Sequence, residues 1–393
     1  MPKILRIINR FNIGGPTYNA TFLTRFLSDD FETLLIGGLP EEGEADSLHI
    51  PREYGVEPTI LEEMKRIPNF KSDREAYLKI KQIIKEFKPD IVHTHASKAG
   101  ALGRKAAFAC KVPIVVHTFH GHVFHSYFGN LKTKLFKFIE RRLAKKSTGI
   151  IAISDIQKDE LTKIHKICEA SKVKVIPLGF DLQKFQVNLE EKRKAVREKY
   201  AIAENEVAVA IIGRLAPIKN HTFFFQVVNK ILEKGIQKVK FFVVGDGELL
   251  NEIQAKTKEI NSKYGEKVVM TSWIKDIATF NAGMDIICLT SDNEGTPVSL
   301  IEAQASNVVV ISTDVGGVKD IMLDGETGFV IEKGDLNNYT EKLGILIEND
   351  EIRRLMSQNS WNYVRDKFSY TRLVKDMETY YNELLKNNEK NKK

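Results

Sequence analysis

The chain has 393 residues, of which 42% are hydrophobic and 28% charged, and its formal net charge is +7. This length favours two or three domains of about 100–200 residues each. No apolar run approaches the roughly 20 residues of a membrane span, and the N-terminal MPKILRIINRFNIGG lacks the features of a signal peptide. Cys110, Cys168 and Cys288 lie far apart, without metal-binding or disulfide spacing. We therefore expect a cytoplasmic globular protein without a disulfide framework.

Short runs of β-branched and other apolar residues recur along the chain and alternate with helical periods. In the first half they span residues 3–9, 33–38, 90–95, 113–118, 149–154 and 172–179, and in the second half 206–215, 239–247, 267–272, 285–290, 308–313 and 328–333. Apolar strands that alternate with helices are typical of parallel sheets covered on both faces. The sequence therefore predicts the α/β class with doubly wound sheets.

A polar, highly charged stretch at residues 181–205 separates the two series of strands. It contains no strand-like run, which favours a linker between a first domain (1–180) and a second domain (206–365). In open α/β sheets, ligands bind beyond the carboxyl ends of the strands. Two such domains facing each other would place the site in a central cleft.

The segment from residue 130 to residue 147 concentrates positive charge. Its cations lie among apolar residues at helical spacing: Lys132, Lys134, Lys137, Arg141, Arg142, Lys145 and Lys146 among Leu131, Leu135, Phe138, Ile139 and Leu143. A helix packed on a core with a solvated basic face would explain this pattern. A helix in peripheral contact with an anionic membrane would explain it as well, and both interpretations stay open.

The stretch SDNEGTPVSLIEA, residues 291–303, follows a predicted strand and opens a helix. Thr296 suits the N-cap and Pro297 the first helical position. A helix start attracts anions or sugar hydroxyls, because its backbone N–H groups are unpaired. Plain capping explains Thr296 and Pro297, but it does not explain Glu302 inside an apolar run, where an unpaired carboxylate is costly. We expect Glu294 to project from the loop toward a ligand.

The segment GRLAPIKN, residues 213–220, places Arg214 and Lys219 just after a predicted strand. An arginine fork and a mobile lysine charge suit a diphosphate. The alternative is a surface arginine and a lysine at a helix start, but that lysine would oppose the helix dipole. We therefore expect both cations to bind phosphate.

Two glycine-bearing turns follow other predicted strands. FNIGGP carries Gly14 and Gly15, and paired glycines allow either a tight turn or the close approach of a ligand. GDGELL begins at Gly245 and lacks the third glycine of the dinucleotide fingerprint, so NAD binding is not expected.

Histidines cluster at the late strand ends of the first domain. HTFHGH contains His117, His120 and His122, and VHTH contains His93 and His95. A metal site is conceivable from this spacing, but no cysteine or carboxylate accompanies the histidines, and we expect no metal. The chain also lacks any Asp-x-Asp, the usual mark of a metal-held nucleotide-sugar, so Arg214, Lys219 and backbone N–H groups would have to meet the diphosphate charge.

An ordered set of motifs resembles one family. The segments are FNIGGPTYNATFLTRFL, KPDIVHTHASKAG, HTFHGHVF, IPLGFD, GRLAPIKN, VVGDGEL, SWIKDI and TDVGGVKDIMLDGETGF. With the Glu-x7-Glu spacing of Glu294 and Glu302, they resemble the retaining glycosyltransferases of family 4, over nearly the whole chain. The resemblance implies the GT-B architecture: an acceptor-binding domain, a nucleotide-sugar-binding domain, and a C-terminal helix (366–388) that crosses back to the first domain.

The resemblance also implies an activity. This is metal-independent transfer of a hexose from a nucleotide-diphospho-sugar, with UDP the expected nucleotide, to a hydroxyl acceptor. The acceptor would be a sugar or a lipid-linked sugar in bacterial cell-envelope polysaccharide or glycan synthesis. No cofactor is implied, because the nucleotide-sugar is a substrate.

Residue roles follow from the same resemblance. Glu302 would bind the ribose hydroxyls, and Glu294 would bind the donor sugar beside the backbone of Gly295, Thr296 and Pro297. The other implied donor residues are Gly14, Gly15, Arg214, Lys219, Gly245, Trp273 and Ile274, with ordinary core packing the alternative for Trp273. The catalytic residues would be His120, Glu294, Arg214 and Lys219, and the acceptor side could include His95, Lys98 and His122.

Other functions remain open on the sequence. A nucleotide-sugar epimerase or hydrolase could use the same scaffold, since fold does not settle chemistry. A non-catalytic binding protein would not need Glu294, Glu302, Arg214, Lys219 and His120 together. Nucleic-acid binding is not expected, because the charge excess is small and the basic segment lacks interleaved aromatic residues suited to groove reading. Thr296-Pro297 stands where many family members have an aromatic or other apolar pair, which leaves the sugar's identity open.

Overall fold

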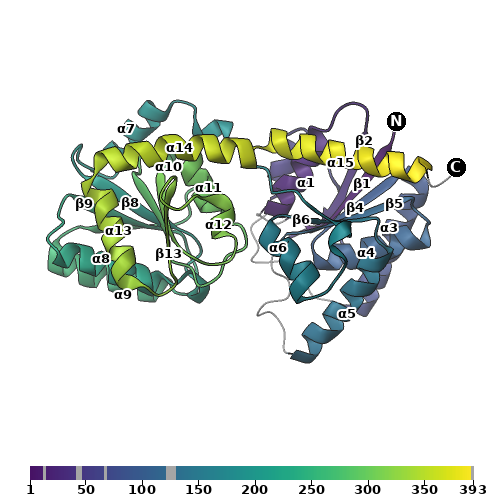
Figure 1. Cartoon of the computed structure of the whole chain (residues 1–393), viewed down its shortest axis with the longest axis horizontal. Helices are drawn as coiled ribbons and strands as arrows, with labels where there is room; N and C mark the ends of the chain where they lie inside the picture. The colour runs from purple at the N-terminus through teal and green to yellow at the C-terminus, as the bar shows by residue number, and fades with distance from the viewer. Residues whose placement is uncertain (12–14, 41–46, 66–68, 121–129, 391–393) are drawn as a thin grey trace. The chain divides into compact units, whose positions relative to one another are not determined.

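The computed structural model describes residues 1–11, 15–40, 47–65, 69–120 and 130–390, with only the backbone described at residues 130–132. The chain divides into two compact units (Figure 1). The first comprises Met1–Phe180 and Phe368–Lys393, and the second comprises Asp181–Lys367. Each contains one parallel sheet, which confirms the predicted α/β class.

The first unit is built on a 7-stranded sheet in the order β3-β2-β1-β4-β5-β6-β7. Its strands are β1 (Lys3–Arg10), β2 (Glu32–Gly38), β3 (Thr59–Ile60), β4 (Ile91–His95), β5 (Ile114–Phe119), β6 (Gly149–Ala152) and β7 (Val173–Val175). Each apolar run predicted in the first half of the chain overlaps one of these strands. The sequence analysis missed β3, because two residues are too few to show a period.

Helices cover both faces of the first sheet. They are α1 (Gly15–Arg25), α2 (His49–Glu53), α3 (Phe70–Phe87), α4 (Ser97–Ala109), α5 (Asn130–Lys146), α6 (Asp155–Asp159) and the C-terminal α15 (Tyr370–Lys390). Successive strand residues point to opposite faces. Ile4 accordingly packs in a cluster with Leu23 of α1 and Met377 of α15, whereas Leu5 packs with helices α3 and α4.

The second unit is built on a 6-stranded sheet in the order β10-β9-β8-β11-β12-β13. Its strands are β8 (Val207–Ile212), β9 (Val239–Val244), β10 (Val268–Thr271), β11 (Ile286–Leu289), β12 (Val309–Thr313) and β13 (Gly328–Ile331). Its helices are α7 (Leu189–Lys199), α8 (His221–Glu233), α9 (Leu250–Tyr264), α10 (Ile277–Ala282), α11 (Val298–Ala305), α12 (Val318–Ile321), α13 (Leu336–Glu348) and α14 (Asp350–Phe368). The strands again follow the predicted runs.

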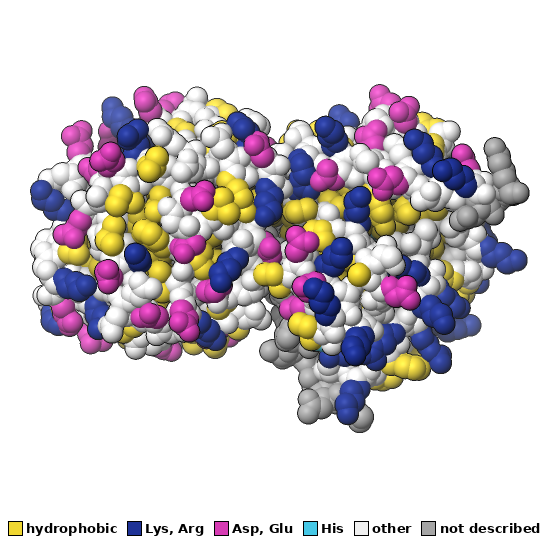
Figure 2. Space-filling model, viewed as in Figure 1, with side chains coloured by type: hydrophobic (Ala, Val, Ile, Leu, Met, Phe, Trp, Pro, Cys, Tyr) yellow, Lys and Arg dark blue, Asp and Glu magenta, His cyan; other side chains and the backbone are white. Residues whose placement is uncertain are grey.

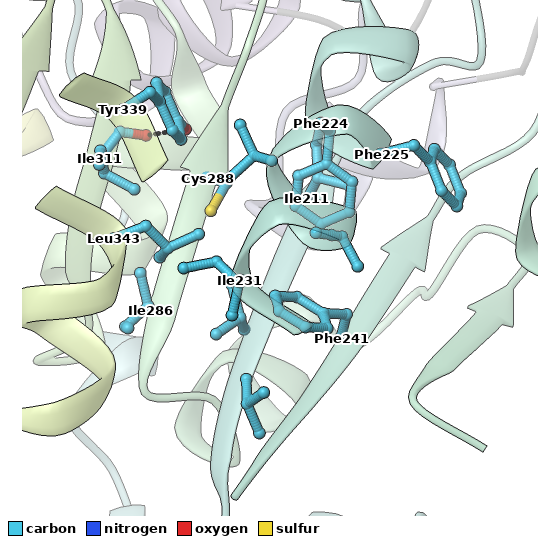
Figure 3. Packing of buried hydrophobic residues seen from close by; sticks show 14 of the residues in the cluster. Ile211, Phe224, Phe225, Ile231, Phe241, Ile286, Cys288, Ile311, Tyr339 and Leu343 are labelled. Atoms are coloured by element: carbon cyan, nitrogen blue, oxygen red, sulfur yellow. Dashed lines mark hydrogen bonds between the residues drawn. The ribbon is translucent and has the colours of Figure 1, made fainter. Parts of the chain in front are cut away.

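One face of the second sheet forms the large core shown in Figure 3. Phe241, Cys288 and Ile311 from three strands pack with side chains of α8 and α13. Tyr339 lies fully buried among them, and its hydroxyl donates to the carbonyl oxygens of Ile311 (3.1 Å) and Leu289 (3.3 Å). The hydroxyl is therefore satisfied inside an otherwise apolar core.

The polar stretch 181–205 is not the free linker that its composition suggests. It contains α7, which packs on α10, and it belongs to the second unit. Arg193 and Arg197 each reach a carboxylate oxygen of Asp285, at 2.7 and 3.2 Å, and Val196 is buried. The charges that make this stretch look solvated are partly used in binding it to the sheet, which sequence composition cannot reveal.

The chain leaves the second unit through α14 and returns to the first through α15. The helix break falls at Ser369. There the backbone N–H of Phe180 donates to the carbonyl of Phe368 at 2.8 Å, and that of Tyr370 donates to the carbonyl of Phe180 at 3.0 Å. α15 then packs in the same core cluster as β1, β4 and β5.

The strand order of each sheet defines one topological switch point. In each sheet the chain turns in opposite directions from a central pair of strands, β1 and β4 in the first sheet and β8 and β11 in the second. Loops that follow such a pair leave a crevice where ligands bind in open α/β sheets. The sites described next lie at these strand ends.

Candidate active site

The loops after β8 and β11 meet through an ion pair. Lys219 ends a 3₁₀ turn (Pro217–Lys219), and its Nζ donates to Oε1 of Glu294 at 2.6 Å. The Oγ of Ser291 donates to the same carboxylate oxygen at 2.5 Å. The two charged side chains are only 25% and 10% exposed, so water screens their attraction less than that of a surface pair. The carboxylate of Glu294 thus compensates the positive charge of Lys219 within the protein. The sequence analysis explained this lysine by phosphate binding alone.

The helix after Glu294 begins later than the sequence suggests. α11 starts at Val298, its N-cap is Pro297, and no side chain caps it. The prediction that Thr296 is the N-cap and Pro297 the first helical residue is therefore wrong. The ψ of Pro297 is 93°, which is extended and excludes that residue from the helix. The first turn of α11 carries no acidic residue, so its partial positive charge is left for a ligand.

Glu302 lies on α11 between the buried residues Ile301 and Ala303. The side chain is half-buried, and desolvation raises the pKa of its carboxyl to about 7, opposed by the positive charge of Lys184. Near neutral pH the carboxyl therefore exists in both protonation states. It can accept a hydrogen bond from a hydroxyl when ionised and donate one when protonated.

Arg214 stands exposed after β8, and its Nη2 donates to Oε2 of Glu248 at 3.1 Å. Exposed ion pairs of this kind are weak, so a phosphate could replace Glu248 at little cost. Gly245 brings the loop after β9 against this segment. Its φ is +143°, and a Cβ there would lie 2.0 Å from the carbonyl oxygen of Gly213, so no larger residue fits.

A second glycine pair supports the Glu294 loop. The backbone N–H of Gly317 donates to the carbonyl oxygen of Gly295 at 3.1 Å. Gly316 has a φ of +50°, and a Cβ there would lie 1.8 Å from the carbonyl oxygen of Glu294. The sequence analysis quoted this segment without giving it a role. The available signal was the pair of adjacent glycines that closely follows a predicted strand. For the polar partners, it was Ser291 three residues before Glu294, and Glu248 next to Gly247.

Trp273 and Ile274 follow β10 at the same edge of the sheet. Trp273 is 56% exposed and Ile274 is half-buried. Ordinary core packing, the alternative for Trp273, is therefore excluded. An exposed indole can offer a flat apolar face to a ring.

In the first unit, the strand ends bring two histidines together. Nδ1 of His95 lies 2.8 Å from Nε2 of His120, and the rings are 5.0 Å apart. Burial lowers the pKa of His120 to about 3 and that of His95 well below its usual value, so both are neutral at physiological pH. Nδ1 of His120 and Nε2 of His95 are buried and have no hydrogen-bond partner among the residues that the structure describes.

Lys98, Gly15, Gly14 and His122 are the other candidates in the first unit. Lys98 pairs with Asp73 at 2.5 Å and donates to the carbonyl of Lys65 at 2.8 Å. Gly15 opens α1, and a Cβ there would lie 3.3 Å from Cδ1 of Leu178. Gly14 and His122 lie outside the described residues.

Neither a metal cluster nor a membrane span is found in the described part of the chain. Within residues 1–11, 15–40, 47–65, 69–120 and 130–390, no three His, Cys, Asp or Glu side chains are grouped so that they could hold a metal ion. Across the same ranges, every helix is too short or too polar to cross a bilayer.

Comparison with known proteins agrees with this geometry. The profile described as "Glycosyltransferase Family 4" matches residues 14–184, and that described as "Glycosyl transferases group 1" matches residues 192–362. A relative from Escherichia coli, "UDP-Gal:alpha-D-GlcNAc-diphosphoundecaprenol alpha-1,3-galactosyltransferase", is 30% identical over 333 residues, which cover 84% of each chain. The "Capsular polysaccharide biosynthesis glycosyltransferase CapM" of Staphylococcus aureus is 30% identical over 348 residues, covering 86% of this chain and 88% of CapM.

A solved structure shares the fold. The crystal structure of Anabaena HepE in complex with UDP superposes with a TM-score of 0.79 over 97% of this chain and 100% of HepE, at 19% identity. The architecture is thus GT-B, two Rossmann-like units with parallel sheets. With the relatives above, it shows that this chain is a glycosyltransferase and belongs to glycosyltransferase family 4, which confirms the resemblance found in the sequence.

Proposed function

We propose that the protein transfers a hexose from a UDP-sugar to a lipid-linked sugar during synthesis of a cell-envelope polysaccharide, with retention of anomeric configuration. The observation that carries this proposal is the Lys219–Glu294 ion pair at the end of β11, which holds a cation and a carboxylate together at the switch point. The name of the Escherichia coli relative supports the acceptor class, that of the Staphylococcus aureus relative supports polysaccharide synthesis, and the UDP in HepE supports the nucleotide.

The donor is assigned to the second unit. Lys219 and Arg214 bind the diphosphate, Glu302 accepts from the ribose hydroxyls, and Glu294 binds the sugar together with the backbone of residues 295–297. Trp273 and Ile274 form a wall for the base, and Gly245 allows the loops to approach each other. The raised pKa of Glu302 supports its role, because a half-buried carboxyl gains most from hydroxyl donors that stabilise its ionised form.

The reaction needs no nucleophile from the protein. The bond between the sugar's anomeric carbon and the phosphate oxygen breaks, and a bond from the acceptor oxygen forms on the same face. The acceptor's proton passes to the departing phosphate. Lys219 and Arg214 stabilise the charge that grows on that phosphate, which is the step where fixed charges contribute most. Two cations at this place would allow transfer without a metal.

The acceptor is assigned to the first unit. The neutral His95–His120 pair suits a sugar hydroxyl, because a neutral imidazole can donate from one nitrogen and accept at the other. Lys98 and His122 are further candidates for binding the acceptor, and Gly14 and Gly15 remain candidates for binding the donor. We further propose that the enzyme works at the cytoplasmic face of a membrane, where a lipid-linked acceptor would be met.

A thermal-shift titration tests the donor site. UDP, GDP and ADP are added in the presence of a chelator to wild type, Glu302→Ala and the exposed control Glu332→Ala. A nucleotide at 100 times its dissociation constant should stabilise the fold by about 2.7 kcal/mol. A chelator-insensitive shift with UDP alone, lost in Glu302→Ala and kept in Glu332→Ala, supports the assignment. No shift with any nucleotide would overturn it.

Product analysis distinguishes glycosyl transfer from a second function on the same scaffold, that of a nucleotide-sugar epimerase or hydrolase. An epimerase or a hydrolase converts the donor without an acceptor. Transfer requires a new glycosidic bond on a supplied acceptor, with the anomeric configuration read by NMR.

A further inference from the structure

Two of the apolar runs that form strands in the second unit end in threonine. The run 285–290 ends at Thr290, directly after β11, and the run 308–313 ends at Thr313, the last residue of β12. Both residues are buried, with exposed fractions of 1% and 2%. A buried hydroxyl is costly unless it forms a hydrogen bond, so the partners of these two side chains indicate what they contribute.

Thr290 reaches the turn that carries Lys219. Its Oγ1 lies 3.1 Å from the carbonyl oxygen of Lys219 and 3.1 Å from that of Asn220. A carbonyl oxygen can only accept, so the hydroxyl is the donor and shares its one proton between the two oxygens. The backbone N–H of Asp292 donates to the carbonyl oxygen of Ile218 at 2.8 Å. The loop after β11 thus binds three successive carbonyls of this turn.

These hydrogen bonds fix the backbone on both sides of Lys219. Each peptide unit is planar, so the carbonyl of Ile218 orients the plane before the Cα of Lys219, and the carbonyl of Lys219 orients the plane after it. The next residue, Asn220, has a φ of +47°, a left-handed conformation that residues with a Cβ seldom adopt. The bonds from Thr290 and Asp292 therefore stabilise a turn whose own backbone preference is weak.

The carboxylate of the Lys219–Glu294 pair is held in a similar way. Oγ1 of Thr313 donates to the carbonyl oxygen of Ser291 at 2.8 Å. The Oγ of Ser291 in turn donates to Oε1 of Glu294, the oxygen that accepts from Nζ of Lys219. Because β11 and β12 are neighbours in the sheet, one sheet supports both partners of the ion pair.

This support distinguishes the Lys219–Glu294 pair from the charges on the surface. Figure 2 shows Lys and Arg side chains interspersed with Asp and Glu side chains over the visible face of the second unit. Exposed ion pairs are weak, because long side chains lose conformational entropy when they are held in one geometry. At Lys219 and Glu294, buried hydroxyls hold the backbone segments that carry both charges.

A third buried threonine shows the contrasting case of a hydroxyl that serves one helix only. Thr340 is 1% exposed, and its Oγ1 donates at 2.7 Å to the carbonyl oxygen of Leu336, four residues earlier in α13. The hydroxyls of Thr290 and Thr313, in contrast, join separate loops of the candidate site. Thr340 is therefore a matched control for the loss of a buried hydroxyl.

We propose that Thr290 and Thr313 are positioning residues that hold Lys219 and Glu294 in a fixed geometry at the donor site. Thr290 fixes the turn that carries the cation, and Thr313 fixes the loop that carries the carboxylate. Charges stabilise a transition state best when they are held in place beforehand, and a displacement of about 1 Å can cost about 100-fold in rate. The catalytic consequence rests on the proposed function, whereas the geometry of the pair can be measured without a substrate.

A double-mutant cycle in the full chain measures that geometry. Urea denaturation of the wild type, Lys219→Met, Glu294→Gln and the double variant gives the coupling free energy between the two side chains. The cycle is then repeated with Thr290→Val, which keeps the shape of the side chain and removes its hydroxyl. The coupling should fall to about half or less of its wild-type value. It should be unchanged with Thr340→Val and largely restored with Thr290→Ser.

Thr313→Val gives an independent measurement, because it leaves Thr290 intact and should weaken the same coupling. Thr340→Val also removes a buried hydrogen bond and should lower the free energy of unfolding to a similar extent, so a loss of stability alone does not imitate a positioning role. The proposal is overturned if the wild type shows no coupling, or if the coupling is unchanged in Thr290→Val or Thr313→Val.

Steady-state release of UDP tests the catalytic consequence. In Thr290→Val, kcat should fall by about tenfold to 100-fold with a smaller change in the KM for the UDP-sugar. Thr290→Ser should recover most of the rate, and Thr340→Val should have the wild-type kcat. A wild-type kcat in Thr290→Val would overturn the positioning role.

A thermal-shift titration of the wild type with UDP separates the two proposals. A UDP shift together with an unchanged coupling in Thr290→Val rejects the positioning role alone. A reduced coupling in Thr290→Val without a UDP shift in the wild type supports the positioning role and rejects the donor assignment.

Discussion

The two units carry different kinds of polar group at the carboxyl ends of their strands. In the second unit these groups are ionic: Lys219 with Glu294, and Arg214 with Glu248. In the first unit they are the neutral imidazoles of His95 and His120. A diphosphate needs charge, whereas a hydroxyl needs a donor and an acceptor, so the difference matches the proposed division between donor and acceptor.

The first unit does hold charged pairs, but they lie elsewhere. Its buried pair, Arg104 with Glu140, joins α4 to α5, and its basic residues cover the outside of α5. Charge in the first unit thus contributes to packing and to a surface, and charge in the second unit stands at the strand ends. Removing charge should therefore affect stability in one unit and ligand binding in the other.

The largest effect is expected for Glu140→Ala in the first unit. It leaves the fully buried Arg104 guanidinium without its partner, which should lower the free energy of unfolding by about 3–5 kcal/mol. Urea denaturation measures the loss, and the UDP shift of the remaining folded protein should be normal. Asp159→Ala, which breaks the exposed pair with Lys163, should change stability by only about 0.5 kcal/mol or less. Equal losses in the two variants would contradict the distinction.

Lys219→Met in the second unit should reduce kcat by about 100- to 1,000-fold, because a fixed charge on the departing phosphate is lost. Steady-state release of UDP measures the rate. The control is Lys333→Met, which removes a more exposed lysine paired with Asp292 at 3.1 Å in the same unit. A wild-type rate in Lys219→Met would contradict the assignment of the diphosphate to this site.

Glu302→Gln should change how stability depends on pH. Folding raises the pKa of Glu302 from 4.5 to about 7, so the folded chain holds this proton more tightly than the unfolded chain. The stability from this group is fully present below pH 4.5 and declines as the pH rises to about 7. The variant should lack this decline and be more stable by up to about 3 kcal/mol at alkaline pH, while binding UDP more weakly. Parallel stability curves would contradict the raised pKa.

The smallest effect is expected for Trp273→Ala. The indole is exposed, so thermal stability should be unchanged. The loss of ring stacking should weaken UDP binding by about threefold to tenfold, measured by calorimetry. Trp361→Ala, on α14, should leave UDP affinity unaltered. Equal UDP affinity in Trp273→Ala would place the base elsewhere.

The sequence by itself determined the strands and the family. The apolar runs coincide with the strands because a strand buried on both faces must be apolar throughout, whatever surrounds it. Arg214, Lys219, Glu294 and Trp273 were predicted as site residues for a related reason: each follows such a run, and parallel strands end at one edge of a sheet.

Only the tertiary structure decided which of these residues meet. Lys219 and Glu294 are 75 residues apart, and Tyr381 is 288 residues from His93, so no local pattern could pair them. Tertiary packing also assigned 181–205 to the second unit and turned Leu135 and Phe138 outward. Composition records how much charge and apolar area a segment has. Which side is buried depends on neighbours that the folded chain brings from far along the sequence.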